Sequence, residues 1–261
     1  MEPAVGLIRG FVVDFFNRHD ASACRRLMAP DYALRVGDLV MSGRDEQYVP
    51  AVQGQFDRFP GLGMTVHDLV VSGNRIALHF SEHGASGGPG GPCAAWSGVA
   101  LYRSDGVRLT GCVAEEDYFA RRRQLTTGAV DPIDPPMPAP WDTASQPADP
   151  DAEEVVSRWL AGGGATGIDG VLRDDEHLGL SPPLVVDVTE TVITEIFSAG
   201  SHVAFHARQI GRCIAGLPAA SPMAGPVVLS SAGIVSVVDG SVRRGRMIRD
   251  RAGMQRSLLA P

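Results

Sequence analysis

The sequence predicts an α+β fold built from two tandem, cone-shaped barrels, each a curved antiparallel sheet covered by helices. In the first part of the chain, apolar residues recur at helical spacing and then at strand spacing, with turn signals between the strands. The same markers return in the same order after a proline-rich stretch, as expected of a duplicated domain.

The first part predicts helices followed by a long meander. Val5, Ile8, Val12 and Phe15 recur at helical spacing, Asp20 is a candidate cap for a second helix, and the Asp105-Gly106 dipeptide indicates a hairpin turn. The expected helices cover residues 4–18, from Asp20 to just before Pro30, and about 45–58; the expected strands cover 32–36, 63–71, 74–83, 93–103 and 107–117. This order favours a pocket between the sheet and the helices.

Residues 126–152 are rich in proline and poor in periodic apolar residues, which excludes a helix or a central strand there. We interpret them as a linker between a first domain at 1–125 and a second at 153–261, and both parts have ordinary domain sizes.

The second part repeats the first in a shorter form. Residues 72–79 are echoed by 199–206, and Asp105-Gly106 is echoed by Asp239-Gly240. A helix is expected at 152–161 and strands near 184–196, 201–213, 225–237 and 241–249. The third helix has no counterpart, so we expect a pocket in this half to be open or collapsed.

Composition excludes several function classes. All 23 basic residues are arginine, which excludes a Walker-type phosphate loop, a Schiff base and a pyridoxal-phosphate anchor. The net charge of -7 disfavours nucleic acid as a partner. No apolar run suggests a membrane span, no signal peptide is evident, and the four dispersed cysteines indicate free thiols in a cytoplasmic protein. We expect neither a cofactor nor a metal site.

Five short motifs are spread in a fixed order over roughly residues 5–125, at 16–20, 29–32, 59–64, 66–70 and 117–125. Together they resemble the SnoaL-like polyketide cyclases of the nuclear-transport-factor-like, ketosteroid-isomerase-like superfamily. The resemblance implies a fold of α+β cones. Because the copies are in tandem, the chain is also similar to the two-domain epoxide hydrolase/cyclases of polyether antibiotic pathways. Since the superfamily includes both enzymes and binding proteins, the fold alone does not establish function.

Asp117, at the end of the last predicted strand of the first part, is the first candidate for catalysis. The resemblance implies that this position holds the acid/base of a SnoaL-like cyclase. A carboxylate at the mouth of an apolar pocket has a raised pKa, which suits proton transfer. The alternative is that Asp117 is exposed beside Glu115 and Glu116 and pairs with Arg121.

His79 is a second candidate, as a proton shuttle or a group that orients a substrate oxygen. It shares one strand face with His83, whereas Leu78 and Phe80 point the other way, and the sequence leaves open which face lines the pocket. We favour the alternative that His79 lies on the outer face at a contact between the two domains, because His206 repeats it.

Asp38 and Arg35 flank the short strand after the second helix, and the polyether-type resemblance implies a carboxylate pair in which Asp38 takes part. The expected glutamate partner is missing from residues 64–68, which weakens this interpretation, and an aspartate at such a place is more often just a turn residue. The candidate substrate-binding residues are Tyr32, Arg35, Tyr48, Phe56, Trp96 and Tyr102, although most such aromatic residues belong to ordinary cores.

Counting back from Gln255 puts Ile248 at the place of Asp117, so we predict that the second domain has lost catalysis. It would pack against the first as the second half of an intramolecular pseudo-dimer, and a further homodimer stays open. We expect a cofactor-independent acid/base enzyme of natural-product biosynthesis that closes a ring, or isomerises, a hydrophobic small molecule. The alternatives are an epoxide hydrolase or epoxide-opening cyclase, and a non-catalytic binding protein.

Overall fold

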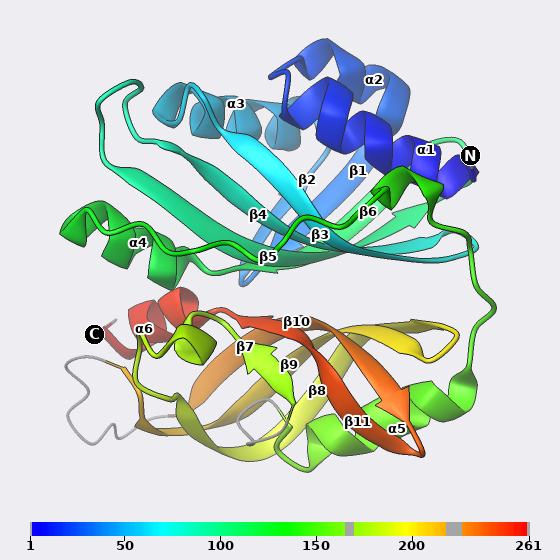
Figure 1. Cartoon of the computed structure of the whole chain (residues 1–261), viewed down its shortest axis with the longest axis vertical. Helices are drawn as coiled ribbons and strands as arrows, with labels where there is room; N and C mark the ends of the chain where they lie inside the picture. The colour runs from blue at the N-terminus through cyan, green and yellow to red at the C-terminus, as the bar shows by residue number, and fades with distance from the viewer. Residues whose placement is uncertain (1, 165–169, 218–225, 260–261) are drawn as a thin grey trace.

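The computed structural model describes residues 2–164, 170–217 and 226–259. The chain forms two layered halves stacked on each other, each a curved sheet with helices on its far side (Figure 1). Residues 128–149 connect the two halves and have no regular structure except for a 3-10 turn at Pro140–Asp142. None of the described helices is both long enough and apolar enough to cross a membrane.

The first half contains a six-stranded sheet in the order β2-β1-β6-β5-β4-β3, in which only β1 and β6 are parallel. The strands are β1 (Met28–Val36), β2 (Leu39–Ser42), β3 (Gly63–Ser72), β4 (Arg75–Ala85), β5 (Cys93–Ser104) and β6 (Leu109–Glu116). The helices are α1 (Pro3–Arg9), which continues as a π-helix at Gly10–Phe16, α2 (Cys24–Leu27), a π-helix at Arg44–Tyr48, α3 (Val49–Arg58) and α4 (Tyr118–Thr127).

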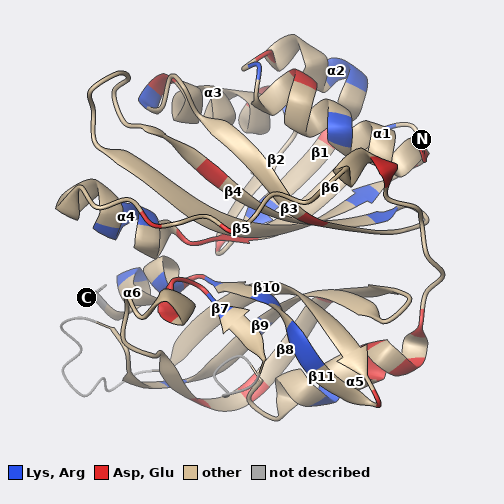
Figure 2. Cartoon of the chain, viewed as in Figure 1, with Lys and Arg blue, Asp and Glu red and all other residues tan. Residues whose placement is uncertain are grey.

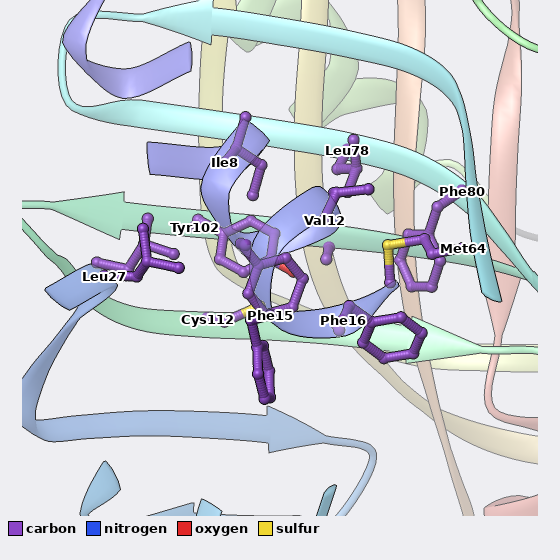
Figure 3. Close-up of a cluster of buried hydrophobic side chains, with 14 of the residues drawn as sticks. Ile8, Val12, Phe15, Phe16, Leu27, Met64, Leu78, Phe80, Tyr102 and Cys112 are labelled. Atoms are coloured by element: carbon purple, nitrogen blue, oxygen red, sulfur yellow. The ribbon is translucent and has the colours of Figure 1, made fainter. Parts of the chain in front are cut away.

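The core of this half lies between the N-terminal helices and the concave face of the sheet. Phe15, Phe16 and Val12 pack onto Leu78 and Phe80 of β4 (Figure 3). The helix can approach α2 closely because residue 10 is glycine: a Cβ atom there would lie 2.6 Å from Leu27 Cδ2.

The second half repeats this topology in a five-stranded sheet, β7-β11-β10-β9-β8, in which β7 and β11 form the parallel pair. Its elements are α5 (Pro150–Ala161), β7 (Val171–Arg173), β8 (Val185–Ala199), β9 (His202–Ala215), β10 (Val227–Val238), β11 (Ser241–Arg249) and α6 (Arg251–Leu259). A meander of four strands followed by a terminal helix is therefore common to both halves, as the internal repeat predicts.

The two sheets pack against each other through their outer faces. Ala77, Val99 and Leu101 of the first sheet lie against Ala204 and Ile234 of the second in one buried cluster. Each sheet thus has one face toward its own helices and one toward the other half, and successive residues of a strand alternate between these environments.

The structure corrects some of the expected elements. The second helix ends at Leu27, and β1 begins at Met28, so Pro30 lies inside a strand and does not end a helix. The short strands β2 and β7 and the terminal helices α4 and α6 were not predicted. The start of the strand expected at 225 lies outside the described residues; from Val227 onward that strand is β10.

Candidate active site

The first half encloses a cavity of about 330 Å³ between the concave face of its sheet and its helices. Most of its wall is apolar or aromatic. Its carboxyl, amide and guanidinium groups are those of Glu82, Glu116, Gln55, Asp250 and Arg256. The polar and aromatic residues that line it are Phe11, Phe16, Tyr32, Tyr48, Gln55, Phe80, Glu82, Tyr102, Cys112, Glu116, Tyr118, Asp250 and Arg256. Asp250 and Arg256 belong to the second half, so both halves contribute to the mouth.

Two carboxyl groups of the first half face this cavity, Glu82 from β4 and Glu116 from β6, and Asp250 of the second half is the third. The strands flank β5, where Glu82 is opposite Trp96 and Glu116 is opposite Gly98. Strand alternation puts Glu82 on the same face as Leu78 and Phe80, and Glu116 on the same face as Cys112 and Ala114. Glu82 is only 3% exposed, and Glu116 is half-buried in the cavity wall.

The surroundings separate the two carboxyl groups in acidity. Burial, and next the charge of Glu116, raise the pKa of Glu82 well above its ordinary value, although Arg121 and Gln55 act in the opposite direction. Burial also raises the pKa of Glu116, but hydrogen bonds from Trp96 and Tyr118 and the nearby Arg121 favour its charged form. Of the two, Glu82 therefore holds its proton more tightly, and the charged form of Glu116 is the better stabilised.

Hydrogen bonds hold both groups in place. The Gln55 side-chain amide donates to Glu82 Oε2 at 2.6 Å, and the indole Nε1 of Trp96 donates to Glu116 Oε2 at 2.8 Å. The guanidinium group of Arg121 stacks on the rings of Tyr118 and Trp96, at 4.2 and 4.9 Å from their centroids. The acid, the base and their nearest cation are thus fixed by packed side chains, as efficient proton transfer requires.

Three tyrosines, Tyr32, Tyr48 and Tyr102, form the inner wall together with Cys112. Burial raises the pKa of each tyrosine well above its usual range, and it also raises the pKa of the Cys112 thiol. These groups are consequently neutral at physiological pH. They can donate hydrogen bonds to a substrate oxygen but cannot act as anionic nucleophiles.

Asp117 lies outside this cavity, which corrects the expectation that it is the pocket acid. The chain leaves β6 at Glu116, and Asp117 caps α4, accepting a hydrogen bond from the Ala120 amide at 3.0 Å. Its carboxylate pairs with the buried Arg251 of the second half at 2.8 Å. Burial raises its pKa to about 6, but the group is held in an ionic cluster with no substrate-sized space beside it.

Asp250 occupies the place of Asp117 in the second half. It precedes α6 and accepts from the Gly253 amide at 2.7 Å, and its own amide donates to Ser230, as that of Asp117 donates to Ser97. The sequence-based alignment of Ile248 with Asp117 is therefore wrong. The glutamine of the terminal helix comes seven residues after Asp117 in the first half but only five residues after Asp250 in the second.

His79 is also outside the cavity, on the sheet face toward the linker and the second half. Its Nε2 lies 2.9 Å from Ser97 Oγ and 3.5 Å from Asp134 of the linker. Burial lowers its pKa well below the usual value, so the ring is neutral. His206 lies at the same interface, 2.9 Å from Glu115 Oε1. The contact role favoured for His79 agrees with this position, and the proton-shuttle role does not.

Asp38 and Arg35 do not reach the cavity either. Asp38 lies in the turn between β1 and β2, where its side chain is 73% exposed and pairs with Arg208 at 3.4 Å. Arg35 alternates with the cavity-lining Leu34 and Val36, so it faces the other side of β1. Asp38 is a turn residue outside the cavity.

The aromatic candidates divide into two groups. Tyr32, Tyr48 and Tyr102 line the cavity directly. Phe56 packs behind the wall against Phe15 and Phe16, and Trp96 contributes through its hydrogen bond to Glu116.

Glu82 and Glu116 are the residues that sequence analysis missed. A signal was available for both, because each carboxylate shares its strand parity with apolar residues, Leu78 and Phe80 in one case and Ala114 in the other. A charged residue on an otherwise apolar strand face is unusual and indicates a functional site.

A family model and several solved structures each match less than half of this chain. Residues 8–112 match the family model of the SnoaL-like domain. Similar solved structures include a candidate SnoaL-like polyketide cyclase from Jannaschia sp. CCS1 (17% identity, 48% of this chain and 92% of the other, TM-score 0.44). They also include IdmH, a candidate polyketide cyclase from Streptomyces antibioticus (22%, 48% and 99%, 0.43), and an LEH-like epoxide hydrolase from M. tuberculosis (14%, 48% and 86%, 0.42). No curated protein matches the chain. At these identities and TM-scores the structural likenesses say nothing about the reaction.

Proposed function

We propose that the SnoaL-like domain in the first half of this chain is a cofactor-independent acid/base catalyst that closes a ring in a hydrophobic, carbonyl-bearing small molecule. Glu116 is the general base and Glu82 the general acid. The substrate class we infer is polyketide-like, and the pathway class is natural-product biosynthesis. The observation that carries the proposal is the pair of carboxyl groups, Glu82 and Glu116, that face one largely apolar cavity from the strands on either side of β5.

The chemistry follows from the protonation states. Glu116 takes a proton from the carbon next to a substrate carbonyl, while Glu82 donates its proton to the carbonyl oxygen, giving an enol. The enol carbon attacks a second carbonyl of the same molecule, forming the new carbon–carbon bond. As it does so, the enol hydroxyl returns its proton to Glu82, and Glu116 delivers its proton to the new alkoxide. Both groups end in their starting states, so no cofactor is consumed.

The cavity contributes in two further ways. Its apolar walls exclude water, which strengthens the hydrogen bonds to a developing enolate. The hydroxyl groups of Tyr32, Tyr48 and Tyr102 can orient the oxygens of a substrate with several carbonyls.

The test is hydrogen exchange at carbon, which needs only the first chemical step. Wild-type protein is incubated in D₂O with hydrophobic ketones from 2-tetralone to 1-phenylhexane-1,3,5-trione, and deuterium uptake and ring closure are followed by NMR. We expect Glu116→Gln and Glu82→Gln to lower the catalysed rate about 10²–10⁴-fold. The exposed Glu154→Gln is the matched control and should leave it unchanged. Equal rates in wild type and Glu116→Gln would remove Glu116 from the mechanism.

Epoxide opening is the second candidate, because the same pair supplies both groups that it needs. Glu116 would accept a proton from water or a substrate hydroxyl, and Glu82 would protonate the epoxide oxygen. Reaction in ¹⁸O-labelled water separates epoxide hydrolysis from carbon–carbon ring closure, since only hydrolysis adds a solvent oxygen to the product. A protein that binds these compounds tightly without turning over any of them would be a binding protein instead.

A further inference from the structure

A second hollow, of about 430 Å³, lies where α4 and α6 meet, next to the mouth of the cavity. Its wall carries four arginines: Arg58 at the end of α3, Arg121 and Arg122 on α4, and Arg256 on α6. Basic residues stand on both terminal helices on the side where the halves face each other (Figure 2). The hollow is therefore strongly positive in a chain whose net charge is -7.

Among the described residues, no acidic side chain lines this hollow and none forms an ion pair with any of its four guanidinium groups. The neighbouring arginines behave differently: Arg123 pairs with Asp131 and Asp175, and Arg251 pairs with Asp117. Arg121 also acts on Glu82 and Glu116, and Arg256 on Asp250, but the described wall of the hollow itself holds four arginines and no carboxylate, which favours an anionic ligand there.

The hollow is also preorganised. Arg121 is stacked among the rings of Tyr118, Trp96 and Phe59, with its guanidinium carbon 4.2 to 5.9 Å from the ring centroids. Arg122 is held from the second half by Gln255, whose side-chain oxygen lies 3.5 Å from Nη1. A planar guanidinium fixed in this way presents its paired N–H donors to carboxylate or phosphate oxygens at a reduced cost in side-chain entropy.

The hollow and the cavity share Tyr118 and Arg256, so one molecule can occupy both. We propose that the four arginines bind a carboxylate or phosphate group of the substrate, whose apolar body enters the cavity toward Glu82 and Glu116. This rests on the proposed function for the cavity as the substrate site, but not on any particular reaction. It also gives the second half a direct part in recognition, because Arg256 comes from α6.

Equilibrium binding tests the proposal without any turnover. The probes are 8-anilinonaphthalene-1-sulfonate and N-phenyl-1-naphthylamine, which have the same rings and differ only by the sulfonate. Decanoate, decyl phosphate and decanol then compete for the bound probe. We expect the sulfonate probe to bind the wild type at least tenfold more tightly than the neutral one, with affinity falling as salt rises. The stronger competitor among decanoate and decyl phosphate identifies the preferred anion.

The matched variants are Arg122→Gln/Arg256→Gln and, as a control, Arg18→Gln at an exposed site on the N-terminal region. We expect the double variant to bind both probes within threefold of each other and the control to keep the wild-type preference. Equal affinity for both probes in the wild type, or a preference that survives the double substitution, would overturn the proposal. So would failure of every anionic compound to bind. Because these experiments measure affinity alone, they test the anion site independently of the turnover measured with Glu116→Gln, which tests the proposed function.

Discussion

The two halves have one topology but differ at the two positions that matter for chemistry. Counted from the preceding hairpin turns, Gln209 on β9 takes the place of Glu82. Counted from the capping aspartates Asp117 and Asp250, Arg249 takes the place of Glu116. One half therefore has an acid and a base, and the other has an amide and a guanidinium.

In the second half these side chains make their contacts within their own half. Gln209 is fully buried and donates to the Leu160 carbonyl at 3.2 Å, and Arg249 forms ion pairs with Asp174 and Glu176. The segment between α5 and β8 contains, among its described residues, no α-helix that corresponds to α3. The proposed catalysis thus depends on two strand positions and one covering helix that the described part of the second half does not repeat.

The largest effect should come from removing the carboxyl pair. We expect Glu82→Gln/Glu116→Gln to lower turnover by about 10³-fold or more, because both proton-transfer groups are lost. Gln209→Met, at the equivalent place in the second half, should stay within threefold of wild type. The measurement is kcat/KM on the ketone that the wild type processes best. A similar loss in both variants would show that the two halves share the chemistry.

The ionic cluster between the halves should dominate stability. Arg251 is buried against Asp117, Asp174 and Asp175, with contacts of 2.7 to 3.3 Å. Arg251→Met leaves the buried Asp117 without its guanidinium partner, although Asp174 keeps Arg249 and Asp175 keeps Arg123. We therefore expect a loss of about 3–5 kcal/mol in the free energy of unfolding, measured by urea titration.

The matched control for Arg251 is Arg212→Met, which removes an exposed arginine 3.9 Å from Asp187 and should cost less than about 0.5 kcal/mol. Adding Asp117→Asn to Arg251→Met should recover part of the loss. If Arg251→Met were no less stable than the control, the cluster would not hold the halves together.

Periodicity was enough to predict most of the long elements, because burial on one face imposes period 2 on β3–β6 and helical spacing on Val5 to Phe15. It could not choose the face. On β4 the sequence separates His79 from Leu78 and Phe80, but only the packing of the second sheet decides that the histidine face is turned away from the cavity.

The site was missed by one residue for a related reason. Asp117 directly precedes a helix, a common place for a capping aspartate, whereas Glu116 is the last strand residue and points inward. The pairing of Asp117 with Arg251 joins residues far apart in the chain, and local sequence carries no signal for it. The short strands β2 and β7 depend on parallel or edge pairing that periodicity does not reveal.

The pH dependence of stability should separate the interface carboxyl group from those at the surface. Burial raises the pKa of Glu115 well above its ordinary value of 4.5, while burial lowers that of His206 to about 4, so the imidazole is neutral above that pH. A carboxyl group whose pKa is higher in the folded protein than in the unfolded chain stabilises the folded protein fully when the pH is below the unfolded pKa. That stability is lost as pH rises through the folded value.

Glu115→Gln removes this contribution, so we expect its free energy of unfolding to fall less than that of the wild type between pH 5 and 8. The difference should be about 1.4 kcal/mol for each unit by which the folded pKa exceeds the unfolded one. Urea titrations at several pH values measure it, with the exposed Glu190→Gln as the control that should follow the wild type. Parallel curves for wild type and Glu115→Gln would place the titration elsewhere.

The smallest effect is expected at Asp38, where the turn between β1 and β2 touches the second half. Its side chain is 73% exposed, and its ion pair with Arg208 is 3.4 Å long and open to solvent. Asp38→Asn should therefore change the free energy of unfolding by less than about 0.5 kcal/mol and leave kcat/KM within twofold. Asp187→Asn, in a similarly exposed pair of the second half, should behave alike. A loss of tenfold or more confined to Asp38→Asn would make Asp38 part of the acid/base machinery, and the cavity pair alone would then be an incomplete account of the first half.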